Sequence, residues 1–458
     1  MGLARVTGSP TDQTFERLKA RYEQTGRSVP IRFRRVACGM AGPPSGPHLL
    51  HPYPAKLLHQ IPRFFLSVNA LSKPDGLVLD PFCGTGTVLL EALIADRRAV
   101  GADSNPLARL VTRAKTTRLD RESLRRDCEL IRERLAELDR ETDIPDVVNR
   151  SYWFYPHVTR ELGRLSSILL SLREGPTRDF LLMCFSDCVR KVSLADLRVS
   201  VPVRLSLRRY PKRHWLHDSA RKRIEWLRHV NVAKLFFSVV SSNGDRLSTL
   251  SVHRPAGRDR IEALYEDARD LSSGGHEGAC RQPDESVDLV ITSPPYAGAQ
   301  KYIRASSLSL GWLRFAGGQD LRAAERKSIG REHYGRAEYE KYSPTGVAEA
   351  DTVLARLHKA KPLRAHIMST YLQEMRDALR ETARVVKPRG HLVLIIGENK
   401  VCGVRFRTPD VLTRVTKGLG FSVVLELTDT IRARGLMTKR HSSAGLIPRE
   451  HVVVFQKV

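Results

Sequence analysis

The order of apolar and polar positions along the chain predicts an α/β fold. Short apolar runs rich in β-branched residues indicate buried strands. These runs span 77–80, 98–103, 261–267, 287–292, 391–396, 421–427 and 452–455. Helical patterns separate several of them, at 88–96, 105–115 and 367–386. Strands that alternate with helices in this way are typical of a Rossmann-like, mostly parallel, doubly wound sheet.

The same pattern predicts how the chain is divided. Residues 1–46 are mixed and basic and end in a Pro- and Gly-rich stretch, so we expect an N-terminal arm. Residues 47–117 and 258–458 carry the two parts of the α/β domain. Between them, residues 118–257 form a helical, basic insertion. A second, polar insertion occupies 297–365, and we find no internal repeat.

A stiff polar loop follows the strand predicted at 287–292. In Ser293-Pro294-Pro295-Tyr296, each proline restricts the residue before it to extended conformations. The carboxyl ends of strands are where open α/β sheets bind ligands. A hydroxyl, free backbone carbonyls and an aromatic ring in fixed relation suit a flat heteroaromatic base that carries an amino group. The alternative is an ordinary Pro-rich turn, and a second motif upstream makes that alternative weaker.

The second motif is the loop Asp80-Pro-Phe-Cys-Gly-Thr-Gly-Thr87, which closes one strand and opens a helix. Gly84 and Gly86 let a ligand approach the backbone, and the helix N-terminus offers free N–H groups. The spacing matches neither a dinucleotide-binding loop nor a P-loop. Asp103 ends the next strand and can accept from ribose hydroxyls, while Asp267 ends the third and can accept from an adenine amine. For each acid alone, strand-end capping is the alternative. Together they describe an adenosine without phosphates, and S-adenosylmethionine fits.

The charge of the chain predicts a polyanionic partner. The 458 residues include 76 Lys and Arg against 50 Asp and Glu, a net charge of +26. Between residues 198 and 234 there are eleven Lys and Arg against two acids, interleaved with Tyr210, Trp215 and Trp226. This clustering favours nucleic acid binding over a uniformly basic surface. We interpret the two tryptophans as core residues, because tryptophan is usually buried; exposed, they would suit stacking on bases.

Several absent signals narrow the class of protein. No run of 18 or more apolar residues exists, so no membrane span is expected. The first ten residues lack the apolar segment of a secretory signal. Seven scattered cysteines argue against a disulfide framework and for a reducing cytosol, and their spacing predicts no metal site. We therefore expect a cytoplasmic protein without a metal.

The two loops together resemble those of the DNA amino-methyltransferases. That family joins a D-P-F-x-G-x-G-T cofactor loop to an [N/D/S]-P-P-Y catalytic loop, and the Ser form at 293–296 is similar to that of enzymes that methylate N4 of cytosine. The resemblance covers roughly residues 50–117 and 258–458. It implies a Rossmann-like methyltransferase that uses S-adenosylmethionine. The insertion at 118–257 resembles a target-recognition segment, and residues 51–56 resemble the segment that closes over the methionine end of the cofactor.

The resemblance implies roles for individual residues. Ser293 and the carbonyl of Pro294 accept from the target amine, Pro295 stiffens the loop, and Tyr296 stacks on the base. The implied cofactor-binding residues are Tyr53, Lys56, Asp80, Phe82, Gly84, Gly86, Thr87, Asp103, Asn105 and Asp267. The candidate phosphate-binding residues are Arg204, Arg208, Arg209, Lys212, Arg213, Arg221, Lys222, Arg223, Arg432 and Arg440.

The implied reaction is direct displacement on double-stranded DNA. A base in a duplex cannot reach such a pocket, so it must be flipped out or already single-stranded. The neutral hydroxyl of Ser293 favours cytosine N4; adenine N6 and an amine of RNA are the enzyme alternatives. A nucleic-acid binder with an inactive pocket is the non-enzyme alternative, although no key group is missing. Because no nuclease motif is evident, a restriction endonuclease acting on the same site would be a separate chain. DNA binding would place the protein on the nucleoid.

Overall fold

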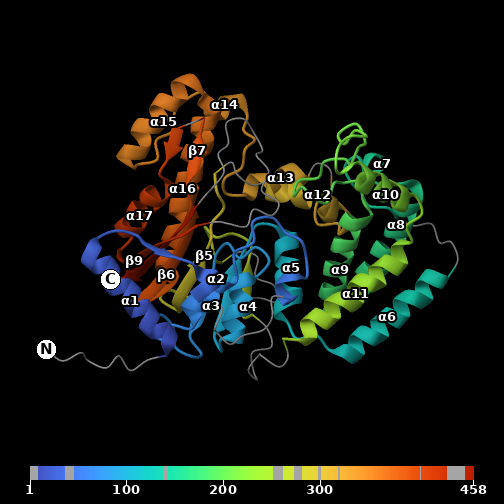
Figure 1. Ribbon diagram of the computed structural model, residues 1–458, viewed down its shortest axis with the longest axis horizontal. Coiled ribbons are helices and arrows are strands. Elements are labelled where there is room, and N and C mark those ends of the chain that lie inside the picture. The colour runs from blue at the N-terminus through green and yellow to red at the C-terminus, as the bar shows by residue number, and fades with distance from the viewer. Residues whose placement is uncertain are drawn as a thin grey trace.

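The computed structural model describes residues 9–36, 46–137, 143–250, 261–272, 281–297, 301–317, 320–402, 404–430 and 449–458. Its central sheet has eight strands in the order β1-β9-β10-β6-β5-β2-β3-β4 (Figure 1). The strands are β1 (Val29–Ile31), β2 (Leu77–Asp80), β3 (Arg98–Ala102), β4 (Ala263–Tyr265), β5 (Val287–Thr292), β6 (Val386–Gly397), β9 (Phe421–Thr430) and β10 (Arg449–Lys457). Neighbouring strands are parallel except at β10, which is antiparallel to both of its neighbours. The predicted α/β fold with a mostly parallel sheet is confirmed.

Helices cover both faces of this sheet. One face packs against α1 (Pro10–Thr25), α3 (Gln60–Leu66) and α4 (Thr87–Ile94). The other packs against α15 (Ala348–Ala360), α16 (Pro362–Val385) and α17 (Thr408–Gly418). Strand β5 shows the result, because Leu289, Val290 and Ile291 have no exposed surface. A strand buried on both faces needs a continuous apolar run, and this is the pattern that the sequence carries there.

A second, helical layer packs beside the sheet domain and lies to the right in Figure 1. Its helices are α5 (Pro106–Thr116), α6 (Arg121–Ala136), α8 (Pro156–Ser171), α9 (Pro176–Val192), α11 (Val232–Ser248) and α12 (Tyr302–Trp312). They share one apolar cluster, in which Phe185 and Trp312 are completely buried. The predicted insertion is therefore helical, but its core also contains α5 from before it and α12 from after the Pro-Pro loop. How these segments divide into functional units stays a prediction.

The remaining elements are short or peripheral. They are α2 (Phe33–Val36), a 3-10 helix (Gly46–Leu49), α7 (Arg150–Trp153), α10 (His217–Arg228), α13 (Asp320–Lys327), α14 (Arg336–Tyr339) and the antiparallel pair β7 (Asn399–Val401) and β8 (Val404–Phe406). In the described parts of the chain, no helix has the length and apolar character that crossing a membrane requires.

The N-terminal segment corrects one expectation. Its described part is not a free basic arm, because β1 pairs in parallel with β9 at the edge of the sheet. Phe15, Val29 and Phe33 are buried there. A strand of three residues is too short to give a clear period in the sequence, so its pairing could not be read from the pattern.

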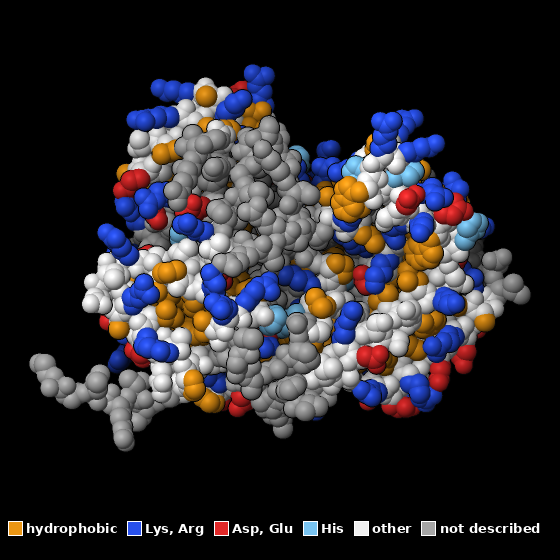
Figure 2. Space-filling view, viewed as in Figure 1, with side chains coloured by type: hydrophobic (Ala, Val, Ile, Leu, Met, Phe, Trp, Pro, Cys, Tyr) orange, Lys and Arg blue, Asp and Glu red, His pale blue; other side chains and the backbone are white. Residues whose placement is uncertain are grey.

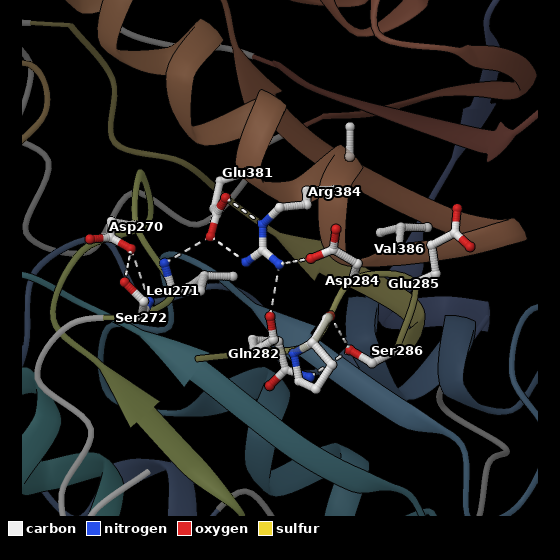
Figure 3. A network of polar contacts seen from close by, with 12 residues as sticks. Asp270, Leu271, Ser272, Gln282, Asp284, Glu285, Ser286, Glu381, Arg384 and Val386 are labelled. Carbon is white, nitrogen blue, oxygen red and sulfur yellow. Dashed lines mark hydrogen bonds and ion pairs between the residues drawn. The ribbon is translucent and has the colours of Figure 1, made fainter. Parts of the chain in front are cut away.

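An arginine at the end of α16 fixes the start of β5 (Figure 3). Arg384 donates to the carboxylates of Glu381 and Asp284. It also donates to the carbonyl oxygen of Gln282 at 2.8 Å. Glu381 accepts in turn from the backbone N–H of Leu271 at 3.0 Å, which ties in the segment after β4. The network therefore anchors the N-terminal end of β5, whose other end runs into the Pro-Pro loop.

Two glycines give the loop between β2 and α4 its shape. Gly84 and Gly86 have left-handed backbones, with φ of 52° and 69°. A Cβ on Gly86 would lie 2.9 Å from Cγ2 of Thr112 on α5, whereas the nearest atom at Gly84 is a ring carbon of Tyr53 at 3.9 Å. Gly86 therefore allows α5 to pack against the loop, and Gly84 keeps space open beside Tyr53.

We expect Gly86→Ala to lower the free energy of unfolding by about 2–4 kcal/mol, because the strain of a left-handed alanine adds to overpacking against Thr112. The matched control, Gly84→Ala, carries only the backbone strain of about 1–2 kcal/mol. Urea midpoints of the two variants, measured under the same conditions, give the comparison. Equal losses would contradict the close packing of α5 at Gly86.

Candidate active site

The sheet changes its direction of growth between β2 and β5. From β2 the chain adds β3 and β4 on one side, and from β5 it adds β6 on the other. The two strands are parallel neighbours, with Leu79 opposite Val290. Their carboxyl ends therefore open side by side at a topological switch point, where open α/β sheets bind ligands. The glycine loop leaves β2 at this place, and the Pro-Pro loop leaves β5.

A hydrogen bond joins the ends of these two strands. Thr292, the last residue of β5, donates its hydroxyl to Oδ1 of Asp80, the last residue of β2, at 2.6 Å. The same oxygen accepts from the backbone N–H of Phe82 at 3.1 Å. Asp80 is only 3% exposed; burial raises its pKa to about 7, although the hydrogen bonds from Thr292 and Phe82 act to lower the pKa. A cation bound beside this carboxylate would stabilise its charged form.

A pocket of about 880 Å³, part of it open to solvent, lies at the switch point. Its wall contains Ser293 and Pro295 from the predicted catalytic loop. Of the predicted cofactor-binding residues, the wall contains Tyr53, Lys56, Asp80, Phe82, Gly84, Thr87, Asp103, Asn105 and Asp267. The structure thus brings together most of the residues that the sequence singled out. Their contacts with a ligand stay predictions.

Three predicted residues are not among those that line the pocket. Gly86 packs against Thr112 of α5. Pro294 is buried. Burial raises the pKa of the Tyr296 hydroxyl well above its usual value. The stacking of Tyr296 on a base therefore stays a prediction.

The other two acids of the pocket have different environments. Asp103 accepts from the backbone N–H groups of Gly84 at 2.9 Å and Asn105 at 2.8 Å, which ties the end of β3 to the glycine loop. Burial raises the pKa of Asp103, and these two N–H groups lower it. Asp267 instead pairs with the guanidinium of Arg269 at 2.7 Å. No motif marked Arg269 as this partner, and the contact of Asp267 with an adenine stays a prediction.

Helix α12 supplies two residues that sequence reasoning missed. Nδ2 of Asn105 donates to Oη of Tyr53 at 3.0 Å and to Oγ of Ser306 at 3.1 Å. The ring of Tyr302 stacks on that of Tyr53, with centroids 6.2 Å apart and planes 22° apart, and Tyr302 lines the pocket. Neither residue belongs to a motif, so no local pattern marked them. The pocket is closed partly by a helix whose other side belongs to the helical layer.

The side chain of Lys56 donates hydrogen bonds to the backbone of its own segment. Its ammonium donates to the carbonyl oxygen of His48 at 3.1 Å and to that of His51. Burial lowers the pKa of Lys56 to about 8. These bonds shape the segment that carries Tyr53 into the pocket. A direct contact of Lys56 with a cofactor stays a prediction.

Only some of the predicted phosphate-binding side chains are exposed to solvent. The exposed ones are Arg208, Arg209, Lys212, Arg213, Arg221 and Lys222. The guanidinium of Arg204 lies 4.6 Å above the ring of Tyr152. Arg223 donates to the carbonyl oxygen of Lys191 at 2.7 Å, so it serves the packing of α10. Arg432 and Arg440 lie outside the described residues.

The charges of the pocket fit S-adenosylmethionine. Three carboxylates line it against two ammonium groups, of which that of Lys56 is bonded to backbone carbonyls and that of Lys327 belongs to an exposed residue. A phosphate would meet the carboxylates of Asp80 and Asp103 unfavourably, whereas a sulfonium and an ammonium would be stabilised beside them. Thr87 begins α4, whose N-terminal N–H groups suit the carboxylate of the methionine part.

Residues 45–110 match the model of a family described as DNA methylases, the N6 and N4 methyltransferases. In this part, which contains the glycine loop, the chain is similar to the DNA amino-methyltransferases. The predicted resemblance to the DNA amino-methyltransferases is thereby confirmed for the part with the glycine loop, and the cofactor of these enzymes is S-adenosyl-L-methionine. The match supports methyl transfer to DNA as the activity. It does not separate cytosine N4 from adenine N6, because the family includes both.

Two curated relatives agree with this placement. The type II methyltransferase M.MvaI of Kocuria varians is 24% identical over 399 residues, which cover 81% of this chain and 81% of the relative. The type II methyltransferase M.MjaII of Methanocaldococcus jannaschii is 28% identical over 79 residues, which cover 17% of this chain and 14% of the relative.

Solved structures give weaker likenesses. TrmN from Thermus thermophilus has a TM-score of 0.28 and 12% identity, with 88% of this chain and 49% of that chain covered. A putative DNA modification methylase from the same organism, complexed with S-adenosyl-L-methionine, has a TM-score of 0.20 and 17% identity, with 38% and 49% covered. The match thus spans about half the length of each structure. At these TM-scores neither structure bears on the chemistry of this chain.

We expect Asp80→Asn to stabilise the cofactor-free protein increasingly between pH 5 and 8. Both hydrogen bonds at Asp80 go to Oδ1, so an asparagine oxygen can accept them while the buried charge is removed. Because the pKa of Asp80 is raised to about 7 in the folded state, the wild type loses stability as pH rises from the unfolded pKa toward 7. The difference between the two proteins should grow by roughly 2–3 kcal/mol over this range and then level off. Denaturation curves at a series of pH values measure it, and a difference independent of pH would contradict the raised pKa.

Proposed function

We propose that the protein methylates the exocyclic N4 amine of cytosine in DNA. The hydrogen bond from Thr292 to Asp80 is the observation that carries this proposal. It fastens the start of the Pro-Pro loop to the start of the glycine loop, so that Ser293 shares a pocket with the carboxylates suited to the methyl donor. A methyl donor and an amine acceptor must meet within one such space for direct transfer.

In this proposal the residues of the Pro-Pro loop make the exocyclic nitrogen a better nucleophile. The lone pair of an exocyclic nitrogen is delocalised into its ring, which makes it a poor nucleophile. Acceptance of its hydrogens by Oγ of Ser293 and by the carbonyl oxygen of Pro294 would draw the nitrogen toward tetrahedral geometry and localise the lone pair. S-adenosylmethionine, when bound, supplies the electrophilic methyl group. Positioning and electrostatics then provide the rate, without a covalent enzyme intermediate.

The choice of cytosine rests on Ser293. A neutral hydroxyl stands where Asp or Asn stands in the other forms of the loop, and the Ser form resembles that of the cytosine-N4 enzymes. Because the pocket lies at the ends of buried strands, the base must leave the duplex to enter it. In this proposal Tyr296 stacks on the flipped base, and the exposed Arg and Lys side chains of the insertion contact the phosphates.

The product of the reaction tests the proposal. Incubation of the protein with labelled S-adenosylmethionine and DNA, followed by nucleoside mass analysis, should give N4-methylcytosine. N6-methyladenine as the product would contradict the choice of base. Label that enters RNA and not DNA would contradict the choice of nucleic acid.

We expect Ser293→Ala to reduce methyl transfer by about 10²–10³-fold, the usual effect of removing one preorganised group at a reacting centre. Binding of S-adenosylmethionine, measured by calorimetry, should stay near the wild-type value. Ser307→Ala is a matched control, because Ser307 lies on α12 outside the pocket wall and donates to the carbonyl of Arg304. Undiminished transfer by Ser293→Ala would refute the assigned role.

A further inference from the structure

The segment before α10 forms a projection with its own small apolar core. Leu205, Tyr210 and Ala220 are buried in it, and Leu216 and Ile224 pack against them. The projection stands at the upper right of Figure 1, and Figure 2 shows Lys and Arg side chains gathered at its tip. This small core is separate from the apolar clusters of the sheet and of the helical layer. It holds the projection in one shape.

Polar contacts make the projection rigid. Asp196 accepts from Oη of Tyr210 at 2.6 Å and from Nε of Arg198 at 2.8 Å. The ring of His214 packs on Tyr210 with centroids 5.0 Å apart. Nδ1 of His214 accepts from the backbone N–H of Leu216 at 3.1 Å, which fixes the backbone on both sides of residue 215.

This rigid frame presents one large aromatic side chain to solvent. Trp215 is 84% exposed, and its ring is stacked beside that of His214 at 6.0 Å. Trp226 is also not a core residue; it is 43% exposed and has the guanidinium of Arg223 5.6 Å from its ring. The expectation that both tryptophans are buried is therefore wrong. Folding gains nothing from holding an indole in water, and the contacts of His214 keep Trp215 there in a defined place.

The surroundings of Trp215 define the chemistry of that partner. The exposed cations on the same projection are Arg208, Arg209, Lys212 and Arg213. Cations around an aromatic ring are complementary to nucleic acid, since phosphates neutralise the cations and a base face stacks on the ring. An acidic or apolar protein surface would satisfy only one of these two features.

We propose that Trp215 stacks on a nucleobase of the bound DNA, while the neighbouring cations hold the phosphates. Bases in an intact duplex are already stacked on one another, so the ring gains most where a base step has opened. Extraction of the target base opens the duplex in this way. The inference therefore rests on the proposed function, and it assigns Trp215 a role in holding the distorted duplex.

Binding of plasmid-derived duplex DNA by Trp215→Ala, measured over a series of salt concentrations, tests the proposal. Stacking is worth about 1–3 kcal/mol per base, so Kd should rise roughly 5- to 150-fold. The slope of log Kd against log salt should stay as in the wild type, because no charge is removed. The double variant Arg208→Ala with Arg209→Ala should instead lower that slope by about 2.

Two control variants accompany this measurement. Trp215→Phe should restore most of the affinity, because a smaller aromatic ring still stacks. Leu207→Ala, which shortens another exposed apolar side chain of the projection, should change Kd by less than about twofold. A Kd for Trp215→Ala within about twofold of wild type, with an unchanged melting temperature, would overturn the inference.

Methyl transfer separates this inference from the proposed function. If the wild type transfers no methyl group to DNA and Trp215→Ala still weakens DNA binding, the proposed function fails and the role of Trp215 stands. If the wild type is active and Trp215→Ala binds DNA equally well, only the role of Trp215 fails. A loss of affinity for RNA without a loss for DNA would also overturn it.

Discussion

The hydrogen bond between Thr292 and Asp80 is the contact on which the site depends. It joins two strand ends that are 212 residues apart in the sequence. One strand carries the glycine loop and the other carries the Pro-Pro loop, so the bond determines how the two loops face each other. Burial of Asp80 strengthens this dependence, because a desolvated carboxyl group needs its hydrogen bonds more than an exposed one does. Because burial also raises the pKa of Asp80, a cation bound beside its carboxyl group would favour the ionised form.

The helical layer is connected to this site by polar contacts as well as by apolar packing. His51 lies just before Tyr53, and its Nε2 is 2.9 Å from Oγ of Ser186 on α9. Ser186 donates in turn to Oγ of Ser309 on α12 at 2.8 Å. All three side chains are buried, so their polar groups hold the layers in one relation. A helix that lines the pocket is thus also a core helix of the layer from which the basic projection extends.

Much of the sheet could be predicted because its strands are buried on both faces. β2, β3 and β5 are mainly apolar and end in polar loops, and their bounds agree with the sequence pattern to within about a residue. The two loops could be recognised because their glycines and prolines restrict the backbone within a few residues. Asp80, Asp103 and Asp267 could be expected in one pocket, because the carboxyl ends of parallel strands lie at the same edge of a sheet.

What the sequence could not give depends on contacts between distant segments. The pairing of β1 with β9 and the place of α12 in the helical core leave no periodic trace. The exposure of Trp215 could not be predicted, because residue type alone favours burial, whereas the surrounding turns and a small separate core hold it in solvent. Local patterns report which face of an element is apolar, and they do not report which partner covers it.

The central claim is that Thr292 fastens the two loops into one active site. The most direct test compares the rate of methyl transfer, at saturating S-adenosylmethionine and DNA, in Thr292→Val and Thr292→Ser. Valine keeps the shape of threonine without the hydroxyl, and serine keeps the hydroxyl. A hydrogen bond to a carboxylate contributes about 1.5–3 kcal/mol, so Thr292→Val should lose roughly 10- to 150-fold in rate while Thr292→Ser stays close to wild type. A Thr292→Val protein as active as the wild type would contradict the account.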